Sequence, residues 1–203
     1  MSDLHFSEVR GRKLLILGDV GRGKTALTAR MISEAVSLSV ATDVTVIDMA
    51  PARRKFKDII IGGRITDFLD AKTNARLLVS TRKLHAPRIE GHTATEIINL
   101  AKANAESIEE LLESYLASPT PILFINDVSI YLQAGETRRL LKTVKAAETF
   151  VANAYHGTTL ADDRHSGISK RERLGLNALK IVMDKVIILH AKSTLTMQNA
   201  IVK

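Results

Sequence analysis

Residues 18–25 read GDVGRGKT and constrain the fold more than any other part of the chain. Three glycines in this short stretch allow the backbone to turn tightly with its N–H groups directed inward. An apolar run at 13–17 (KLLIL) precedes the stretch, and good helix formers at 25–32 follow it. Leu27 and Met31 are spaced to face a sheet. The sequence therefore predicts a strand, a glycine-rich loop and a helix in this order.

The same residues fill every fixed position of the pattern G-x-x-x-x-G-K-[ST], the phosphate-binding P-loop. Lys24 has the reach to contact the β- and γ-phosphates, and the Thr25 hydroxyl is a suitable ligand for Mg²⁺. The partial positive charge at the start of the following helix favours an anion. We therefore expect ATP and Mg²⁺ as ligands. The predicted nucleotide contacts are Gly18, Asp19, Val20, Gly21, Arg22, Gly23, Lys24, Thr25 and Ala26.

The composition excludes several classes of protein. The chain has 203 residues, 45% hydrophobic and 25% charged, which suits a single globular domain spanning 1–203. The absence of cysteine removes disulfides, thiolate zinc sites and cysteine catalysis. No apolar run approaches the roughly 18 residues of a membrane span. Residues 1–13 are polar and lack the apolar core of a signal peptide, so we expect a cytoplasmic protein.

The formal net charge of +7 suggests a polyanionic partner. A basic surface attracts nucleic acid or another polyanion, but it is also compatible with an ordinary solvated surface. Part of the charge is clustered at 53–57 (RRKFK) and at 170–173 (KRER). Aromatic residues make up only 4% of the chain, so stacking surfaces for single-stranded nucleic acid are scarce. Both interpretations stay open.

Strand-like and helix-like segments alternate along the chain. This alternation predicts an α/β fold, a three-layer α/β/α P-loop NTPase fold with a mostly parallel central sheet. Residues 93–117 are expected to form a helix in two pieces that opens with a capping box of Thr93 and Glu96. Residues 58–63 are expected to form an extra strand or a turn. We expect strands at 13–17, 43–48, 77–80, 121–127, 149–155 and 186–190, and further helices at 24–36, 136–148 and 170–184.

A P-loop needs a partner acid for Mg²⁺, which we expect on a strand next to the first. Residues 122–127 (ILFIND) supply it, because four apolar residues lead to Asn126 and Asp127. Ligands bind at the carboxyl edge of open α/β sheets, where this strand ends. We predict that Asp127 holds Mg²⁺ through a water molecule. The alternative is an ordinary acidic turn residue after a strand.

Asp48 and His156 are two further candidates for chemistry at the same edge. Asp48 ends the second strand (VTVIDMAP) and is suited to orient an attacking water. His156 follows the strand after Asp127 (AYHGTT) and is suited to sense the γ-phosphate through a hydrogen bond. Each also has a purely structural interpretation, as a polar exit from a strand.

Three segments together resemble the additional-strand ATPases with a RecA-like core, and among them the secretion and pilus-motor ATPases. They are GDVGRGKT, VTVIDMAP, and ANAYHGTTLADD with the later DKVIILH. The resemblance implies that Asp48 matches an acidic box and His156 a histidine box. It also implies a homo-oligomer in which an arginine from a neighbouring subunit completes the site. The available arginines are Arg53, Arg54, Arg64, Arg138, Arg139 and Arg164.

One departure from this family affects the chemistry. Many of its members carry Asp-Glu where this chain has Asn126-Asp127 followed by Val128. Either Asp127 replaces the glutamate that activates water and Asn126 takes the Mg²⁺ position, or the base comes from elsewhere.

The motifs support three functions. The first is an Mg²⁺-dependent ATPase that couples hydrolysis to conformational or motor work, with Lys24, Asp127, Asp48 and His156 around the phosphates. The second is a P-loop small-molecule or nucleoside kinase, with residues 164–173 as a lid or simply as an exposed loop leading into a helix. The third is a nucleotide-gated binding module without catalysis. The guanine-binding segment N-K-x-D is absent from the sequence, so we expect adenine.

Overall fold

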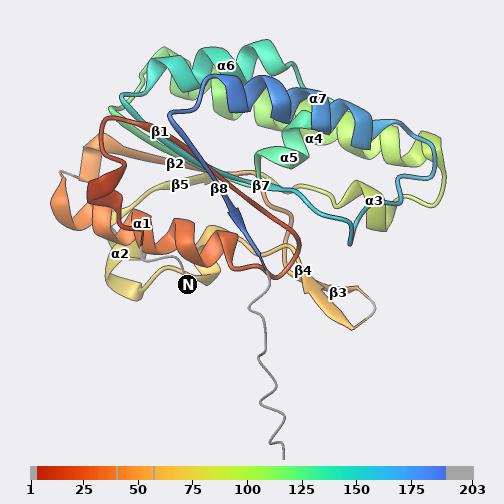
Figure 1. Cartoon of the computed structure of the whole chain (residues 1–203), viewed down its shortest axis with the longest axis horizontal. Coiled ribbons are helices and arrows are strands. Elements are labelled where there is room, and N and C mark those ends of the chain that lie inside the picture. Colours follow the sequence, from red (N-terminus) through yellow and green to blue (C-terminus); the bar gives the residue numbers. More distant parts are fainter. Residues whose placement is uncertain (1–3, 40, 57, 191–203) are drawn as a thin grey trace, which may run out of the picture.

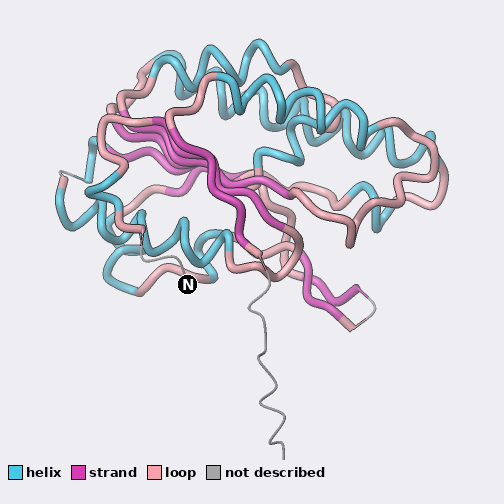
Figure 2. Tube along the Cα trace, viewed as in Figure 1, coloured by secondary structure: helices cyan, strands magenta, loops and turns pink. Residues whose placement is uncertain are grey.

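A six-stranded sheet crosses the centre of the molecule in the order β5-β2-β6-β7-β1-β8 (Figures 1 and 2). The computed structural model describes residues 4–39, 41–56 and 58–190, so Lys57 of the predicted basic run lies outside the described residues. All neighbouring strands pair in parallel, which confirms the predicted α/β class. The strands are β1 (Lys13–Gly18), β2 (Val44–Asp48), β5 (Val79–Thr81), β6 (Ile122–Asn126), β7 (Thr149–Tyr155) and β8 (Lys185–Leu189).

Helices cover both faces of the sheet, which confirms the three-layer architecture. One face is covered by α1 (Lys24–Leu38) and α2 (Ala71–Arg76); the other is covered by α4 (Ala94–Ala117), α6 (Thr137–Ala146) and α7 (Ile168–Ile181) (Figure 1). The alternation within β1 serves both layers. Leu15 and Leu17 join the apolar cluster of α4, α6 and α7, whereas Leu14 and Ile16 join the cluster of α1. A strand buried on both faces therefore appears in the sequence as a continuous apolar run.

The position of β6 differs from our expectation. We expected the strand that leads to Asp127 to lie next to the P-loop strand, but β7 lies between β1 and β6. Each of these strands is buried on both faces, so their apolar runs are alike and do not encode which two are neighbours. β7 is thus an additional strand inserted between the P-loop strand and the Asp127 strand.

Helix α4 is continuous, whereas we predicted two pieces. Asn104 lies near its middle, but this buried amide does not break the helix because it bonds the backbone of His85 through both its oxygen (2.8 Å) and its nitrogen (3.0 Å). At the start of α4, Thr93 accepts a hydrogen bond from Glu96 N at 3.2 Å, as the capping box predicts. The Glu96 carboxylate instead accepts from His92 N at 2.7 Å, one residue before the cap.

Residues 58–63 contribute a strand outside the central sheet. β4 (Ile59–Ile61) pairs antiparallel with β3 (Arg54–Phe56) in a hairpin that projects from the body (Figure 1). Three short helices were not predicted, α2 (Ala71–Arg76), α3 (Pro87–Glu90) and α5 (Val128–Leu132). Short 3-10 turns occupy Phe6–Glu8, Ala41–Asp43 and Ile65–Asp67. Within the described ranges, the helices are too short or too polar to cross a membrane.

Candidate functional site

The glycine-rich loop leaves β1 at the carboxyl edge of the sheet and opens α1. Gly21 (φ 71°) and Gly23 (φ 83°) adopt the left-handed conformation that glycine enters readily. Lys24 is the first residue of α1, and its Nζ donates a hydrogen bond to the Asp19 carbonyl at 2.8 Å. Burial lowers the pKa of Lys24, while the carboxylates of Asp127 and Asp19 oppose this shift. The predicted strand, loop and helix are thus in place.

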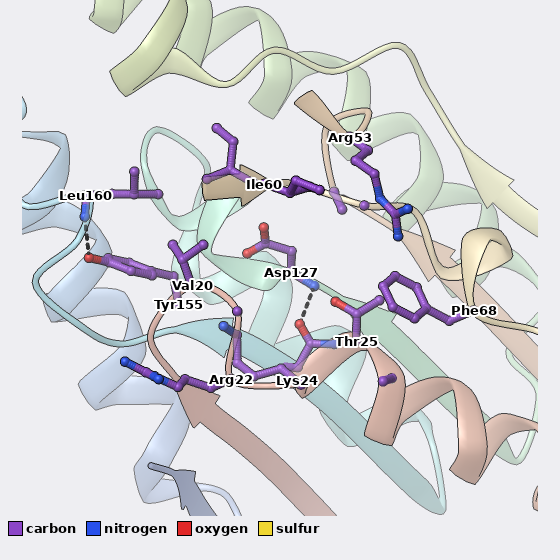
Figure 3. A pocket seen from close by; sticks show the side chains of 18 residues that line it. Val20, Arg22, Lys24, Thr25, Arg53, Ile60, Phe68, Asp127, Tyr155 and Leu160 are labelled. Atoms are coloured by element: carbon purple, nitrogen blue, oxygen red, sulfur yellow. Dashed lines mark hydrogen bonds between the residues drawn. The ribbon is translucent and has the colours of Figure 1, made fainter. Parts of the chain in front are cut away.

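A cavity of about 270 Å³ lies in front of this loop (Figure 3). Its walls come from the loop itself, from the ends of β6 and β7, and from the β3–β4 hairpin with the residues on either side of it. The volume is near the lower end of the range for small-molecule sites. We call this cavity the phosphate pocket. The side chains labelled in Figure 3 are Val20, Arg22, Lys24, Thr25, Arg53, Ile60, Phe68, Asp127, Tyr155 and Leu160.

Asp127 lies in this pocket in an unusual conformation. Its φ of 59° is left-handed, which is uncommon for a residue other than glycine and marks a candidate functional position. Its backbone N–H donates to Asn153 Oδ1 at 3.0 Å, and α5 begins at the next residue. Its Oδ1 atom is buried and has no hydrogen-bond partner in the described structure. Burial raises the pKa of Asp127, and the Lys24 ammonium partly offsets this.

The unpartnered oxygen of Asp127 fits a magnesium ligand. Burying a carboxylate oxygen without a partner is costly unless a ligand satisfies it. The described residues contain no cluster of three or more His, Cys, Asp or Glu suited to a metal ion. Mg²⁺, however, is commonly held by one or two carboxylates together with waters and substrate phosphates. Thr25 and Asp127 both line the pocket and match this smaller ligand set.

Asp48 does not line the phosphate pocket. Its side chain is fully buried, with 0% exposure. One oxygen accepts from Ile65 N at 2.6 Å, and the other accepts from Ala50 N at 3.1 Å and from Asn126 Nδ2 at 2.8 Å. Burial raises the pKa of Asp48, and these hydrogen bonds oppose the rise. Its two oxygens are thus occupied by donors within the protein.

Asn126 belongs to a buried network of amides. Its Oδ1 accepts from Asn153 Nδ2 at 2.8 Å, and this Nδ2 also donates to Thr28 Oγ1 at 2.9 Å. Thr28 Oγ1 in turn donates to the Lys24 carbonyl at 3.0 Å. The network connects the end of β2 to the first turn of α1 through β6 and β7. Sequence reasoning missed Asn153, for which the only signal was a single amide within the apolar strand β7.

His156 and Asp19 lie outside the phosphate pocket. They line a second cavity on the outer side of the loop. The backbone N–H of His156 donates to the Gly18 carbonyl at 2.9 Å. The Asp19 carboxylate accepts from the backbone N–H groups of Thr158 (3.1 Å) and Thr159 (3.3 Å). Burial raises the pKa of Asp19, but hydrogen bonds from these residues and from Val20 outweigh it, and the pKa lies below its usual value.

The six arginines that were candidates for completing the site lie in different parts of the structure. Arg53 lines the phosphate pocket, and its guanidinium lies over the Phe68 ring at 5.4 Å from the centroid. Arg54 pairs with Glu90 at 2.6 Å. The other four, Arg64, Arg138, Arg139 and Arg164, do not line this pocket.

A buried ion pair that sequence reasoning missed lies behind Asp127. Arg88 Nη2 donates to Glu172 Oε2 at 2.8 Å, and Gln133 Nε2 donates to the same oxygen at 3.2 Å. Burial raises the pKa of Glu172, and the Arg88 guanidinium opposes it. Arg88 and Glu172 are 84 positions apart, so no local spacing could have indicated the pair.

Comparisons with known proteins show similarity at the level of the fold. No protein-family model and no curated protein matches the chain. Flagellar accessory protein FlaH from Methanocaldococcus jannaschii is similar with a TM-score of 0.50 at 10% identity, covering 88% of this chain and 71% of FlaH. An ATPase from the type III secretion system of pathogenic bacteria is similar with a TM-score of 0.43 at 16% identity, covering 89% of this chain and 51% of the ATPase. PH0250 from Pyrococcus horikoshii OT3 is similar with a TM-score of 0.46 at 11% identity, covering 92% of this chain and 88% of PH0250. The chain has the RecA-like fold that the sequence predicted.

Proposed function

We propose that this chain binds Mg²⁺ and ATP in the phosphate pocket and hydrolyses ATP slowly, coupling the cycle to conformational work. One observation carries the proposal: Asp127 has a buried, unpartnered carboxylate oxygen and lines the same pocket as Lys24 and Thr25. A cation is the ligand that such an oxygen accommodates best. The RecA-like fold supports the same interpretation.

Each residue has a distinct role in this proposal. The amides of residues 20–26 surround the phosphates, and Lys24 exchanges its hydrogen bond to the Asp19 carbonyl for one to a phosphate oxygen. Thr25 and Asp127 hold Mg²⁺, which would neutralise the charge that develops on the transferring phosphate. Arg53 faces the phosphates from the opposite wall.

Hydrolysis is expected to be slow because the pocket contains only one acid. Asp127 is the sole Asp or Glu among the described residues that line it. A single carboxylate assigned to Mg²⁺ is not free to orient the attacking water. Asp48 is occupied by donors within the protein, and His156 lies in the second cavity. A base supplied from outside this pocket would raise the rate.

The second candidate is the nucleotide-gated binding module, which the single carboxylate also favours. The kinase alternative has less support, because residues 168–173 of the 164–173 stretch form the first turns of α7. There, Arg171 Nη2 donates to the Ala134 carbonyl at 3.0 Å, so that this part of the stretch packs against the body.

The test measures ATP binding and phosphate release with and without Mg²⁺. We expect binding in the wild type and a loss of about 10- to 100-fold in affinity in Lys24→Ala, since a charge-assisted hydrogen bond is removed. Lys102→Ala removes the same charge from an exposed position on α4 and is the matched control. Binding without phosphate release would favour the module. Equal losses in both variants, or none in either, would contradict the proposed site.

A further inference from the structure

A second cavity of about 610 Å³ lies on the outer side of the glycine-rich loop. Its walls come from the segment 156–161 after β7, from α7 and from the end of β8. It is about twice the volume of the phosphate pocket and falls within the usual range for small-molecule sites. The two cavities share Arg22, Tyr155 and Leu160 as wall residues. We call it the basic cavity.

The positive charges in this cavity are not compensated. Arg22, Arg173 and Lys180 line it, and their side chains form no ion pair with any other described residue. The imidazoles of His156 and His190 lie in the same wall. Several cations held around one cavity of this size favour an anion with more than one negative charge.

The two acids in the cavity do not neutralise these cations. Asp19 accepts from the backbone N–H groups of Thr158 and Thr159, and Glu172 is paired with Arg88 at 2.8 Å. Among the described wall residues, the Lys and Arg side chains still outnumber these two carboxylates, so the formal charge of the wall is positive.

One of the cations in the cavity wall, Arg88, is buried. Its side chain is only 7% exposed. Nη2 donates to Ser169 Oγ at 3.1 Å and to Glu172, but its Nε atom is buried and has no hydrogen-bond partner in the described structure. Arg88 therefore adds a buried cation to the wall of this cavity.

Apolar groups complete the wall. Leu176, Ile188, Leu189 and the Tyr155 ring also line the cavity. We propose that the basic cavity binds a small organic phosphate, with its phosphate on the cations and its apolar or planar part on these side chains. A nucleic-acid strand fits less well, since among the described wall residues Tyr155 is the only aromatic ring apart from the histidines.

The site would communicate directly with the P-loop. Asp19 belongs to the loop and holds the segment 156–161 through Thr158 and Thr159. The segment 156–161 is therefore linked to Lys24 through Asp19, whose side chain accepts from the segment and whose carbonyl accepts from Lys24. The binding proposal itself does not depend on ATP hydrolysis.

The experiment follows phenyl phosphate binding by NMR titration of Lys24→Ala, in which the phosphate pocket is weakened. We expect one site, shifts in amides of 156–161 and α7, and tighter binding than for inorganic phosphate because of the apolar wall. Arg173→Ala with Lys180→Ala should weaken binding about tenfold. The matched control, Lys170→Ala with Lys185→Ala, removes two charges from the same α7 and from β8 outside the cavity and should change it less than about twofold.

Three outcomes would overturn the proposal. Equal losses in both double variants would indicate a general charge effect. Displacement of phenyl phosphate from the wild type by a non-hydrolysable ATP analogue would indicate one site shared with the nucleotide. Tighter binding of a single-stranded oligonucleotide at the same amides would assign the cavity to a nucleic-acid surface. If Lys24→Ala fails to fold, wild type saturated with the ATP analogue replaces it.

Discussion

The ends of two neighbouring strands, β2 and β6, carry one aspartate each and use it in opposite ways. Asp48 ends β2 with hydrogen bonds to Ile65, Ala50 and Asn126, and it is fully buried. Asp127 follows β6 with a left-handed backbone and an oxygen that has no partner within the described structure. The same side chain at the same edge of the sheet thus serves the fold in one place and leaves ligand-binding capacity in the other. The two aspartates differ in how many of their oxygens have hydrogen-bond partners, and not in their position at the edge of the sheet.

The strongest test of this contrast is Asp48→Ala. The substitution leaves two buried N–H groups and the Asn126 amide without an acceptor, so the free energy of unfolding should fall by about 3–5 kcal/mol. Urea unfolding measures it. Asp58→Ala removes an exposed carboxylate and should change stability by less than about 0.5 kcal/mol. A loss below 1 kcal/mol in Asp48→Ala would mean that the hydrogen bonds of Asp48 do not support the fold.

Asp127→Asn should produce the opposite result. Phosphate release from Mg²⁺ and ATP should fall about 100-fold, since the charge that holds the ion is lost. The folded chain should nevertheless persist, because asparagine tolerates the left-handed conformation. Steady-state phosphate release, with circular dichroism as the folding control, measures both. Unfolding of this variant would place Asp127 in the same structural class as Asp48.

Asn126→Asp sharpens the comparison by placing a second carboxylate against Asp48. The amide now donates to Asp48 at 2.8 Å, and two carboxylates at that distance cannot both ionise cheaply. The pair binds a proton more tightly in the folded chain, so stability should be lost as the pH rises, by about 1–3 kcal/mol between pH 5 and pH 8 relative to wild type. Hydrolysis should not improve. A faster rate would show that position 126 reaches the metal.

The smallest effect concerns the pH dependence of the Asp127 variant. Burial raises the folded-state pKa of Asp127, so keeping it ionised costs stability at pH values above that pKa, and the cost disappears as the pH falls through it. Without nucleotide, Asp127→Asn should therefore melt higher than wild type at neutral pH, with each 1 kcal/mol corresponding to about 2–4 °C. The difference in melting temperature between the two proteins should disappear at low pH. Melting curves between pH 4 and pH 8 that stay parallel would contradict a raised pKa.

Local patterns predicted the parts of the site that are contiguous in the sequence. The strand, loop and helix around GDVGRGKT followed from glycine positions, one apolar run and helix spacing. The alternation of strands and helices likewise predicted the layers. These features depend on residues within a few positions of each other, which a sequence displays directly.

The remaining features depend on contacts between distant segments. Nothing in the spacing of Asn126 and Asn153 shows that β6 and β7 bring their amides within 2.8 Å. The Arg88–Glu172 pair and the position of β7 between β1 and β6 also depend on segments that are far apart in the sequence. For the same reason the sequence placed both Asp48 and Asp127 among the catalytic candidates, since two of the donors that saturate Asp48 come from the distant residues Ile65 and Asn126.

The hairpin of β3 and β4 has a consequence for how the pocket is held together. One wall of the phosphate pocket is the carboxyl edge of a sheet buried on both faces, while the opposite wall includes Ile60 and Ile61 of a hairpin with three residues in each strand. Such a hairpin has little stability of its own, and it opens at a much lower free energy than the central strands. The pocket therefore joins a wall formed by the buried sheet to a wall that has little stability of its own. A ligand that bridges them makes hydrogen-exchange protection of the hairpin a direct measure of occupancy.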